Sequence, residues 1–190
     1  MTGPPPKLEA IGDAELVRLA RDDSRRAIEV LFRRHASMVH ALSYRLLGRP
    51  HEAQEVAQES LLTAFKDLSK LREPERFSSW LRAICAQKCR SRIRNLKVRR
   101  RLGLLDGPEY DLTHFVSTDP DPAALAELRL LGKAVSRLSA EERATMILVR
   151  VEGMTLPEAA ETLGRSLATI KRRLARAESR LSTLRRQDDG

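Results

Sequence analysis

Aromatic residues are scarce in this chain: Phe, Tyr and Trp make up 4% of its 190 residues. Since aromatic and β-branched side chains favour strands, this shortage disfavours a β-sandwich or a β-barrel. The two cysteines are too few for a disulfide framework, and every apolar run is far too short for a membrane span. The first residues lack the apolar core of a secretory signal. We therefore expect a soluble, cytoplasmic, all-α protein with no membrane insertion.

Positive charge predominates, with a formal net charge of +9, and the two signs are segregated along the chain. Residues 82–101 contain nine Lys/Arg and no acid, whereas residues 106–127 contain six acids and no Lys/Arg. Residues 165–186 contain eight Lys/Arg and one acid. Two basic blocks separated by an acidic one indicate two contacts with a polyanion such as a nucleic acid. The alternative is a set of solvated helix faces, which a mixture of charges would favour.

Apolar residues recur at helical spacing through most of the chain. Asp13 and Ser24 are suited to cap the first two helices, Gly48 and Pro50 to end the second, and Phe77 begins a fourth. An aperiodic stretch rich in Asp and Pro follows, and then helical spacing resumes. The sequence thus predicts two small helical domains joined by an acidic linker. The predicted segments are a flexible N-terminus (1–12), a first domain (13–97), the linker (98–122), a second domain (123–186) and a tail (187–190).

The second domain has the pattern of a helix-turn-helix. Thr155 and Glu158 form a predicted capping box, Gly164 suits a tight turn, and Ser166 can cap a longer helix. The outer face of that helix is expected to be basic and polar, at Thr169, Lys171, Arg172, Arg173 and Arg176. Such a helix fits the major groove of DNA, where arginine binds guanine or phosphate. The alternative is an ordinary helical hairpin with a charged outer face.

The first domain offers an acidic helix face and a pair of aromatic residues. The acidic face lies on a predicted helix, at Glu52, Glu55, Gln58 and Glu59. No Lys or Arg lies between Pro50 and Phe65, so we expect this face to lack internal partner charges. Phe77 and Trp80 lie three residues apart, a spacing more typical of a helix packed in a core than of base stacking.

Three patterns that can indicate chemistry are weak here. The segment from His51 resembles the zinc-protease pattern, but Glu55 stands where the second His is needed. Cys85 and Cys89 lie one helical turn apart and fall short of four zinc ligands, so a core role is favoured. No phosphate-binding loop or nucleophile–base pair is recognisable. We therefore expect no independent enzyme activity, no catalytic residue, no metal and no cofactor.

Four motifs occur in a fixed order along the chain. They are Glu-Val-Ala-Gln-Glu at 55–59, Phe-Ser-Ser-Trp-Leu-Arg-Ala-Ile at 77–84, Thr-Leu-Pro-Glu-Ala-Ala at 155–160 and Thr-Ile-Lys-Arg-Arg-Leu-Ala-Arg-Ala at 169–177. In this order and spacing, over about residues 13–186, the chain closely resembles an extracytoplasmic-function (ECF) sigma factor, from group IV of the sigma-70 family. The resemblance implies a promoter-specificity subunit of RNA polymerase that reads two promoter elements and assists promoter melting.

The resemblance also implies roles for the matching residues. Core RNA polymerase, with its β and β′ subunits, is the expected partner of Glu52, Glu55, Gln58 and Glu59. The −10 element is expected to contact Leu71, Arg72, Glu73, Arg76, Trp80, Arg82, Lys88, Arg90 and Arg94. The −35 element is expected to contact Thr155, Ser166, Thr169, Lys171, Arg172, Arg173 and Arg176. The family further implies promoter DNA and an anti-sigma factor as partners, and a linker that threads toward the active-site and RNA-exit channels of the polymerase.

The chain departs from the family pattern after its Trp-Leu motif, because Gln87 and Ser91 stand where Asn and Asp are usual. Two other hypotheses fit part of the sequence. A helix-turn-helix regulator could bind DNA without entering the polymerase, but it would have no need of the acidic face at Glu55 and Glu59. A sigma mimic could titrate an anti-sigma factor without binding DNA, but it would have no need of the basic face over residues 171–176.

Overall fold

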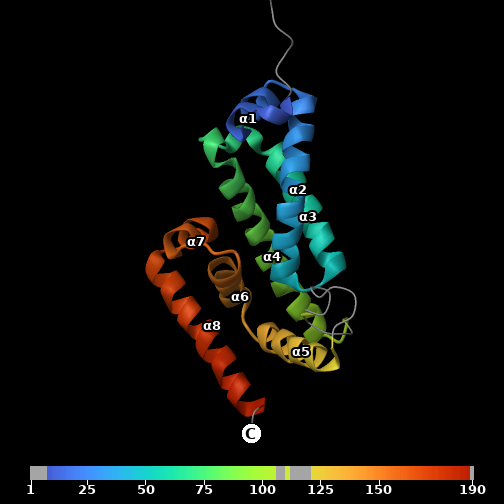
Figure 1. Ribbon diagram of the computed structural model, residues 1–190, viewed down its shortest axis with the longest axis vertical. Helices are drawn as coiled ribbons and strands as arrows, with labels where there is room; N and C mark the ends of the chain where they lie inside the picture. Colours follow the sequence, from blue (N-terminus) through green and yellow to red (C-terminus); the bar gives the residue numbers. More distant parts are fainter. Residues whose placement is uncertain (1–7, 106–109, 112–120, 189–190) are drawn as a thin grey trace, which may run out of the picture.

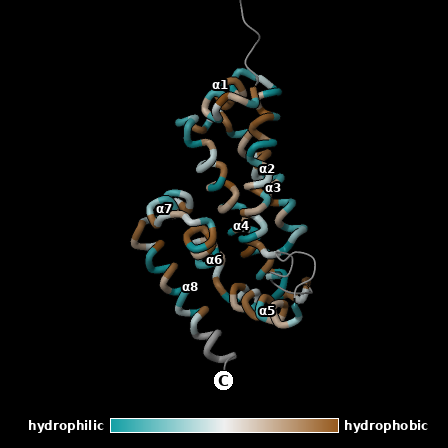
Figure 2. The backbone as a smooth tube through the Cα atoms, in the orientation of Figure 1, coloured by the Kyte–Doolittle hydropathy of each residue, from teal (hydrophilic) through white to brown (hydrophobic). Residues whose placement is uncertain are grey.

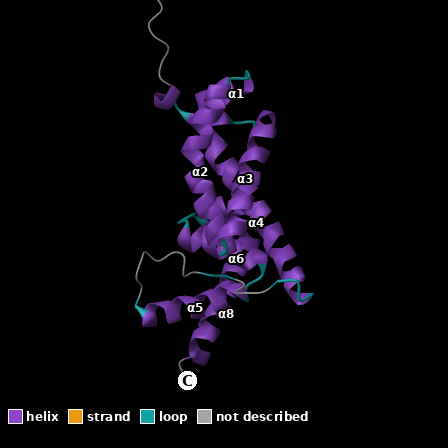
Figure 3. Cartoon of the chain, turned by 90° about the vertical axis from the view of Figure 1, so that its right-hand side faces the viewer, coloured by secondary structure: helices purple, strands orange, loops and turns teal. Residues whose placement is uncertain are grey.

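The computed structural model describes residues 8–105, 110–111 and 121–188, with side chains up to Ser182. Within these ranges every regular element is helical, as Figure 3 shows, which confirms the all-α prediction. None of these helices is long and apolar enough to cross a membrane. The longer helices are α1 (Asp13–Arg21), α2 (Arg25–Leu47), α3 (Pro50–Lys66), α4 (Phe77–Arg101), α5 (Pro122–Ser136), α6 (Ala140–Met146), α7 (Leu156–Leu163) and α8 (Leu167–Asp188). The short elements are η1 (Leu8–Ala10), η2 (Leu68–Lys70), η3 (Pro74–Arg76) and the π-helical η5 (Ile147–Val151).

Helix α4 continues to Arg101, four residues beyond the end predicted for the first domain, and α5 begins at Pro122. Parts of the predicted N-terminus, linker and tail lie outside the described residues, at 1–7, 106–109, 112–120 and 189–190. We refer to α1–α4 as the N-terminal bundle and to α5–α8 as the C-terminal unit.

The N-terminal bundle is organised around the long helix α2. The Ser24 hydroxyl accepts a hydrogen bond from the Ala27 N–H at 3.3 Å and so caps α2 as predicted. Gly48 ends the helix in the left-handed region, with φ of 62°, where its N–H donates to the Tyr44 carbonyl at 2.7 Å. Helices α1, α3 and α4 pack against α2. The largest side chains sealed in this core are Leu16, Leu31, Leu42, Leu46, Leu47, Phe77, Leu81 and Ile93.

Asp13 does not cap α1, contrary to the sequence prediction. Gly12 occupies the cap position and forms no side-chain cap, while Asp13 is the first residue of the helix. The Asp13 carboxylate instead lies 2.7 Å from Nε2 of the buried His35 and also accepts a hydrogen bond from Arg34, both on α2. The carboxylate therefore ties α1 to α2, a partnership between separate helices that helical periodicity does not reveal.

The C-terminal unit begins two of its helices with a capping box. Ser139 and Glu142 form the capping box at α6. Thr155 and Glu158 form the capping box at α7, which is the one that the sequence predicts. Gly164 ends α7 with φ of 59°, and α8 then starts beyond Ser166. The inner face of α8 is buried at Ile170, Leu174 and Ala177, in agreement with the helical pattern.

Helix α5 is much less covered than its apolar sequence suggests. Figure 2 shows apolar residues along much of this helix, yet only Gly132 and Val135 are buried. Leu130 and Leu131 are each 47% exposed. The apolar spacing predicts the helix correctly but not a partner to cover it.

The two units pack on one another through α4, which contacts both α6 and α7 on the side away from α2 and α3 (Figure 1). Lys97 on α4 donates to the carbonyls of Ser136 and Leu138, at 3.0 and 2.7 Å. Near the end of α2, Arg45 pairs with Glu152 at 2.6 Å. The helix predicted to bind promoter DNA is thus also the helix against which the C-terminal unit rests.

Tyr110 in the linker joins both units. Its side chain is buried, and its hydroxyl donates to the Arg45 carbonyl while the neighbouring Asp111 N–H donates to the Gly48 carbonyl at 2.8 Å. The Arg143 guanidinium of α6 lies 4.9 Å from the centre of the Tyr110 ring, a cation–π arrangement. Burial raises the pKa of Tyr110 to about 12. Tyr110 is therefore anchored between α2 and α6.

Replacing Gly48 by Ala should destabilise the protein by about 2–5 kcal/mol. About 1–2 kcal/mol comes from placing a Cβ in the left-handed region, and overpacking adds about 1–3 kcal/mol because that Cβ would overlap the Tyr110 ring. The control is Gly103→Ala, which has φ of 70° but open space around its Cβ and should therefore cost only the backbone part. Urea unfolding measures both losses, and equal losses would contradict the packing of Tyr110 on Gly48.

Candidate polymerase and nucleic-acid interfaces

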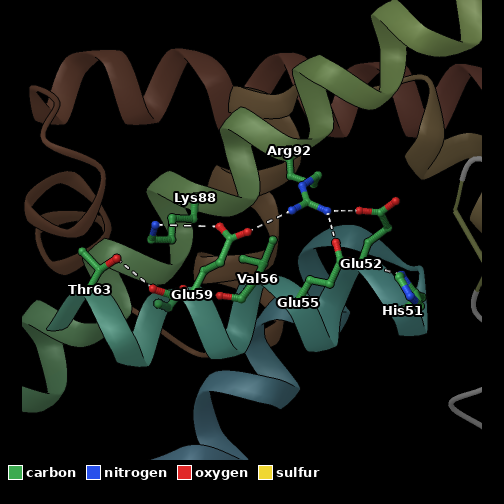
Figure 4. Close-up of polar contacts among 9 residues, drawn as sticks. His51, Glu52, Glu55, Val56, Glu59, Thr63, Lys88 and Arg92 are labelled. Atoms are coloured by element: carbon green, nitrogen blue, oxygen red, sulfur yellow. Dashed lines mark hydrogen bonds and ion pairs between the residues drawn. The ribbon is translucent and has the colours of Figure 1, made fainter. Parts of the chain in front are cut away.

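The acidic face of α3 has a cationic partner on α4, which corrects the expectation that it lacks one. Arg92 donates to Glu55 at 2.6 Å and to Glu59 at 3.2 Å, and it also pairs with Glu52 (Figure 4). Lys88, one turn earlier on α4, lies 3.8 Å from Glu59. The sequence within α3 could not reveal these contacts, because they depend on how α3 and α4 align in space.

Arg92 leaves part of the acidic face open to a partner. The side chains of Glu55 and Glu59 are 45% and 51% exposed, whereas that of Glu52 is 13% exposed. Gln58 is also exposed. The hydrogen bond from Arg92 is the main cause that lowers the pKa of Glu55 below its ordinary value. Glu55 and Glu59 therefore keep part of their carboxylates open to solvent, while the largely buried Glu52 mainly supports Arg92.

The segment predicted to capture a base of the −10 element lines a pocket of about 250 Å³. The pocket is lined in part by Arg72, Glu73, Arg76 and Trp80 from the N-terminal bundle and by Glu161 and Thr162 from α7. An ion pair between Arg76 and Glu161 joins its two walls. The C-terminal unit thus completes this pocket in the arrangement described.

Leu71 is 6% exposed and belongs to the core, yet it also lines the pocket, so its role as a DNA contact stays a prediction. Its carbonyl accepts a hydrogen bond from Arg21 of α1, which fixes the start of the loop. Arg72 and Glu73, which follow it, are exposed. Leu71 is the one aliphatic residue between 71 and 76, and this signal could have identified it as the anchor of the loop.

The basic side chains predicted to hold the −10 strand do not form one free face. Lys88 turns toward Glu59 on α3, which corrects its placement with the others. Arg94 pairs with Glu141 of α6 at 2.7 Å, and the Arg90 Nη1 lies 3.5 Å from the Leu163 carbonyl of α7. Arg82 is partly buried. The C-terminal unit therefore covers much of the surface that the sequence assigns to the −10 element.

The helix-turn-helix exposes part of its predicted DNA face. Lys171, Arg172 and Arg176 on α8 are exposed, and Thr169 is partly buried. Arg173 is also only partly exposed, and Glu141 and Arg165 act on it electrostatically, so it lies at the edge of the outer face and its DNA contact stays a prediction. The helical turn of α8 from residue 172 to residue 176 therefore has a fully exposed side and a partly covered side.

Two polar residues assigned to the −35 element have structural roles in this arrangement. The Thr155 hydroxyl accepts from the Glu158 N–H at 3.4 Å, and the Glu158 carboxylate accepts in return from the Thr155 N–H at 2.8 Å. The Ser166 hydroxyl accepts from the Thr169 N–H at 3.3 Å. Both residues are exposed at helix starts, so a hydroxyl can cap its helix and still lie beside a bound phosphate.

Cys85 and Cys89 are both fully buried against α2 and α3, in line with the core role favoured by their spacing. The Cys85 sulfur lies 3.2 Å from the Ser43 hydroxyl. Burial raises the pKa of the Cys89 thiol well above its ordinary value.

Replacing Arg92 by Gln should raise the pKa of Glu55 toward its ordinary value, because the hydrogen bond that favours the carboxylate is lost. An NMR titration of the Glu55 carboxyl carbon measures this change. A lowered carboxyl pKa stabilises the fold above the unfolded pKa, and this contribution is lost as pH falls through the folded pKa. The variant should therefore lose less stability on acidification than the native chain.

The matched control is Arg99→Gln, which removes an exposed arginine from the same helix. It should leave the pKa of Glu55 unchanged. A Glu55 pKa that moves equally in both variants would show a general loss of charge instead of a specific network around Arg92.

Two segments of the chain match known family models. Residues 31–99 match Sigma-70 region 2, and residues 128–181 match Sigma-70, region 4. The ECF RNA polymerase sigma factor SigM of Mycobacterium tuberculosis is 35% identical over 174 residues, which cover 90% of this chain and 84% of SigM. The RNA polymerase sigma factor CnrH of Cupriavidus metallidurans is 30% identical over 179 residues, which cover 90% of this chain and 93% of CnrH.

Two solved structures of sigma factors have a fold similar to that of this chain. The structure of CnrH in complex with the cytosolic domain of CnrY has a TM-score of 0.64 at 25% identity and covers 93% of this chain and 98% of that chain. The sigma factor RpoE in complex with the anti-sigma factor NepR, from Bartonella quintana, has a TM-score of 0.61 at 23% identity, with 83% and 96% of the two chains covered, and shares the fold. The chain therefore belongs to the ECF sigma factors of the sigma-70 family, which direct transcription by RNA polymerase.

Proposed function

We propose that this chain is a group IV sigma factor that docks on core RNA polymerase through α3, holds the −10 element on α4 and reads the −35 element with α8. The observation that carries the docking step is the exposed acidic surface at Glu55 and Glu59, beside the exposed Gln58. Carboxylates that are half open to solvent can pair with basic groups of a partner, which favours fast and specific association. The expected basic partners lie on the β′ subunit, with further contacts to β, and the site of action is the cytoplasm.

In this proposal, residues 13–97 form the unit that binds polymerase and the −10 element, 98–122 the linker and 123–186 the unit that binds the −35 element. The −10 strand is held by Arg72, Glu73, Arg76, Trp80, Arg82, Arg90 and Arg94. Capture of an unstacked base costs a few kcal/mol, which a pocket and a basic groove recover. Because Arg76 and Arg94 pair with acids of the C-terminal unit, DNA must displace those acids.

The −35 element is read by the solvent side of α8, with support from Thr155, Ser166, Thr169 and Lys171 around the turn. Arg172 lies near the start of the helix and is placed to donate to a base edge. Arg176 lies one turn later and is placed to contact phosphate. An anti-sigma factor is a further proposed partner, since the solved structures of CnrH and RpoE hold the cytosolic domain of CnrY and the anti-sigma factor NepR.

Reversing the charge of the acidic surface should weaken docking on core polymerase. Glu55→Lys with Glu59→Lys should weaken binding to core polymerase at least about tenfold, or about 1.4 kcal/mol, because the added lysines repel a basic partner. Pull-down and fluorescence anisotropy with core polymerase measure the loss, and circular dichroism checks the fold.

The matched control is Glu15→Lys with Glu127→Lys, which changes the net charge equally at exposed sites on α1 and α5. It should bind core polymerase almost as well as the native chain. Full retention of binding by the folded Glu55/Glu59 variant would contradict the proposed docking surface.

The two arginines of α8 should have separable effects on promoter recognition. Arg172→Ala should flatten base preference at one or two positions, since a bidentate contact discriminates by about 1–3 kcal/mol. Arg176→Ala should weaken all sites alike and reduce the salt dependence by about one phosphate contact. Holoenzyme binding to a randomised upstream element at two salt concentrations measures both. An unchanged preference in Arg172→Ala would reject that residue as a reader.

A further inference from the structure

Residues 68–76, which we call the pocket segment, contribute four of the residues that line the pocket. No residue of α1 lines the pocket, yet Arg21 at the end of α1 holds this segment. Arg21 donates from Nε to the Leu68 carbonyl at 3.3 Å and from Nη2 to the Leu71 carbonyl. Arginine suits this role because its planar fork presents several donors at once. Arg21 therefore joins the end of α1 to both ends of η2.

The two carbonyls lie where the buried part of the pocket segment gives way to its exposed part. Leu68 and Leu71 are buried, whereas Arg72 and Glu73 are exposed. Leu71 has extended backbone angles, so η2 ends there. A carbonyl at the end of a helix lacks a donor from a following turn, and Arg21 supplies that donor to Leu71. These hydrogen bonds therefore fix the residue from which the exposed part of the segment starts.

The other end of the pocket segment is also connected to α1. Arg18 of α1 pairs with Glu75 at 2.6 Å, and α1 packs against η3. Phe77 follows the segment directly, and its ring meets the His35 ring edge-on, with 5.1 Å between the centroids. His35 in turn lies 2.7 Å from the Asp13 carboxylate at the start of α1. The exposed residues of the segment thus lie between two ends that are both tied to α1.

Helix α1 is itself fixed in the N-terminal bundle. Its residues Leu16, Val17 and Ala20 are buried in the core. A surface loop is more mobile than a helix packed in this way, so contacts to α1 restrict the motion of the pocket segment. A binding site works best when the residues that line it are held by a rigid element behind them, and α1 supplies that support.

We propose that Arg21 and Arg18 are positioning residues for base capture: they fix the pocket segment and so determine how selectively the pocket holds an unpaired base. This inference rests on the proposed function, in which the pocket segment captures a base of the −10 element. A pocket distinguishes bases only when its polar groups stay close to the geometry that fits one of them. Attraction between basic residues and the DNA backbone depends less on exact position, because charge interactions decrease slowly with distance.

The test measures how well holoenzyme distinguishes bases at each position of the −10 element. The probe is a set of single-stranded oligonucleotides that carry this element with one position randomised at a time, and fluorescence anisotropy reports binding. Arg21→Gln should lower the preference at the captured position at least about threefold, because the shorter side chain cannot serve both carbonyls. Affinity for a duplex −35 fragment should not change. Arg18→Gln should have a smaller effect in the same direction, since its ion pair with Glu75 is more than half exposed.

A conservative variant and a matched control separate positioning from loss of charge. Arg21→Lys should restore most of the base preference, because an ammonium group can donate to two carbonyls, as Lys97 does to Ser136 and Leu138. The control is Arg25→Gln, which removes an exposed arginine at the start of α2. It should leave the base preference unchanged.

Hydrogen exchange in the free chain tests the positioning directly. The amides of residues 72–76 should exchange at least about threefold faster in Arg21→Gln, while the amides in the middle of α2 keep their native rate. Circular dichroism and thermal melting check that each variant is folded at the temperature of the binding experiments. Faster exchange throughout the bundle, together with equally weakened binding of every oligonucleotide, would show a general loss of stability and would overturn the proposal.

Arg72→Ala distinguishes failure of this inference from failure of the proposed function, because Arg72 lines the pocket itself. The captured position is the one at which Arg72→Ala lowers the base preference. If Arg72→Ala lowers that preference and folded Arg21→Gln does not, the base is captured here but α1 does not position the segment, and the inference is wrong. If neither variant lowers any preference, the pocket captures no base, and the proposed function is wrong as well.

Discussion

Helix α4 is shared by two packing partners, and the rest of the structure depends on this sharing. One side of α4 contributes buried residues to the core of the N-terminal bundle, including Phe77, Leu81 and Ile93. The other side carries the basic residues that meet α6 and α7. Deleting one of the buried side chains would cost about 2–5 kcal/mol, so this side fixes α4 in the bundle. The interface with α6 and α7 combines individually weaker polar contacts with apolar packing, because the buried apolar residues of both units form one continuous cluster.

Among the contacts between the two units, the exposed ion pairs are the ones that another partner can replace most easily. Exposed ion pairs contribute about 0–1 kcal/mol each, and the pairs of Arg76 with Glu161 and Arg94 with Glu141 are partly or largely exposed. A polyanion can replace those acids as the partner of the arginines at little cost. Tyr110 is a stronger contact, because its buried ring is held by both α2 and α6. Separation of the units would therefore require Tyr110 to leave α2 or α6 and would also break the apolar cluster that both units share.

Arg92 links α4 to the acidic face of α3 within the N-terminal bundle. It lies on the same helix as the basic residues but turns toward the acids of α3. A partner that binds Glu55 and Glu59 therefore changes the surroundings of a residue on α4. The surface proposed for polymerase and the helix proposed for the −10 element are connected by direct hydrogen bonds across the bundle.

Local sequence signals predicted most of the helices and their ends. Ser24, Gly48, Thr155 and Gly164 act within a few residues of themselves, so their roles follow from sequence and local geometry. The same signals placed the helix-turn-helix and its exposed basic side.

The sequence was less informative wherever a residue found its partner on another element. Asp13 binds His35, and Arg92 binds the acids of α3. Arg173 is only partly exposed, and Leu71 anchors a loop in the core. Periodicity gives the face of a helix but not which helix lies opposite. A single sequence therefore identified the candidate surfaces and left open which of them are covered.

The central claim is that promoter binding and the packing of the C-terminal unit on α4 exclude each other. The most direct measurement is the distance between dyes at Gln54 on α3 and Ala175 on α8, in the free chain and in holoenzyme bound to promoter DNA. The claim predicts one short distance in the free chain and a clearly longer one in the promoter complex. A distance that stays short while the promoter is open would contradict it.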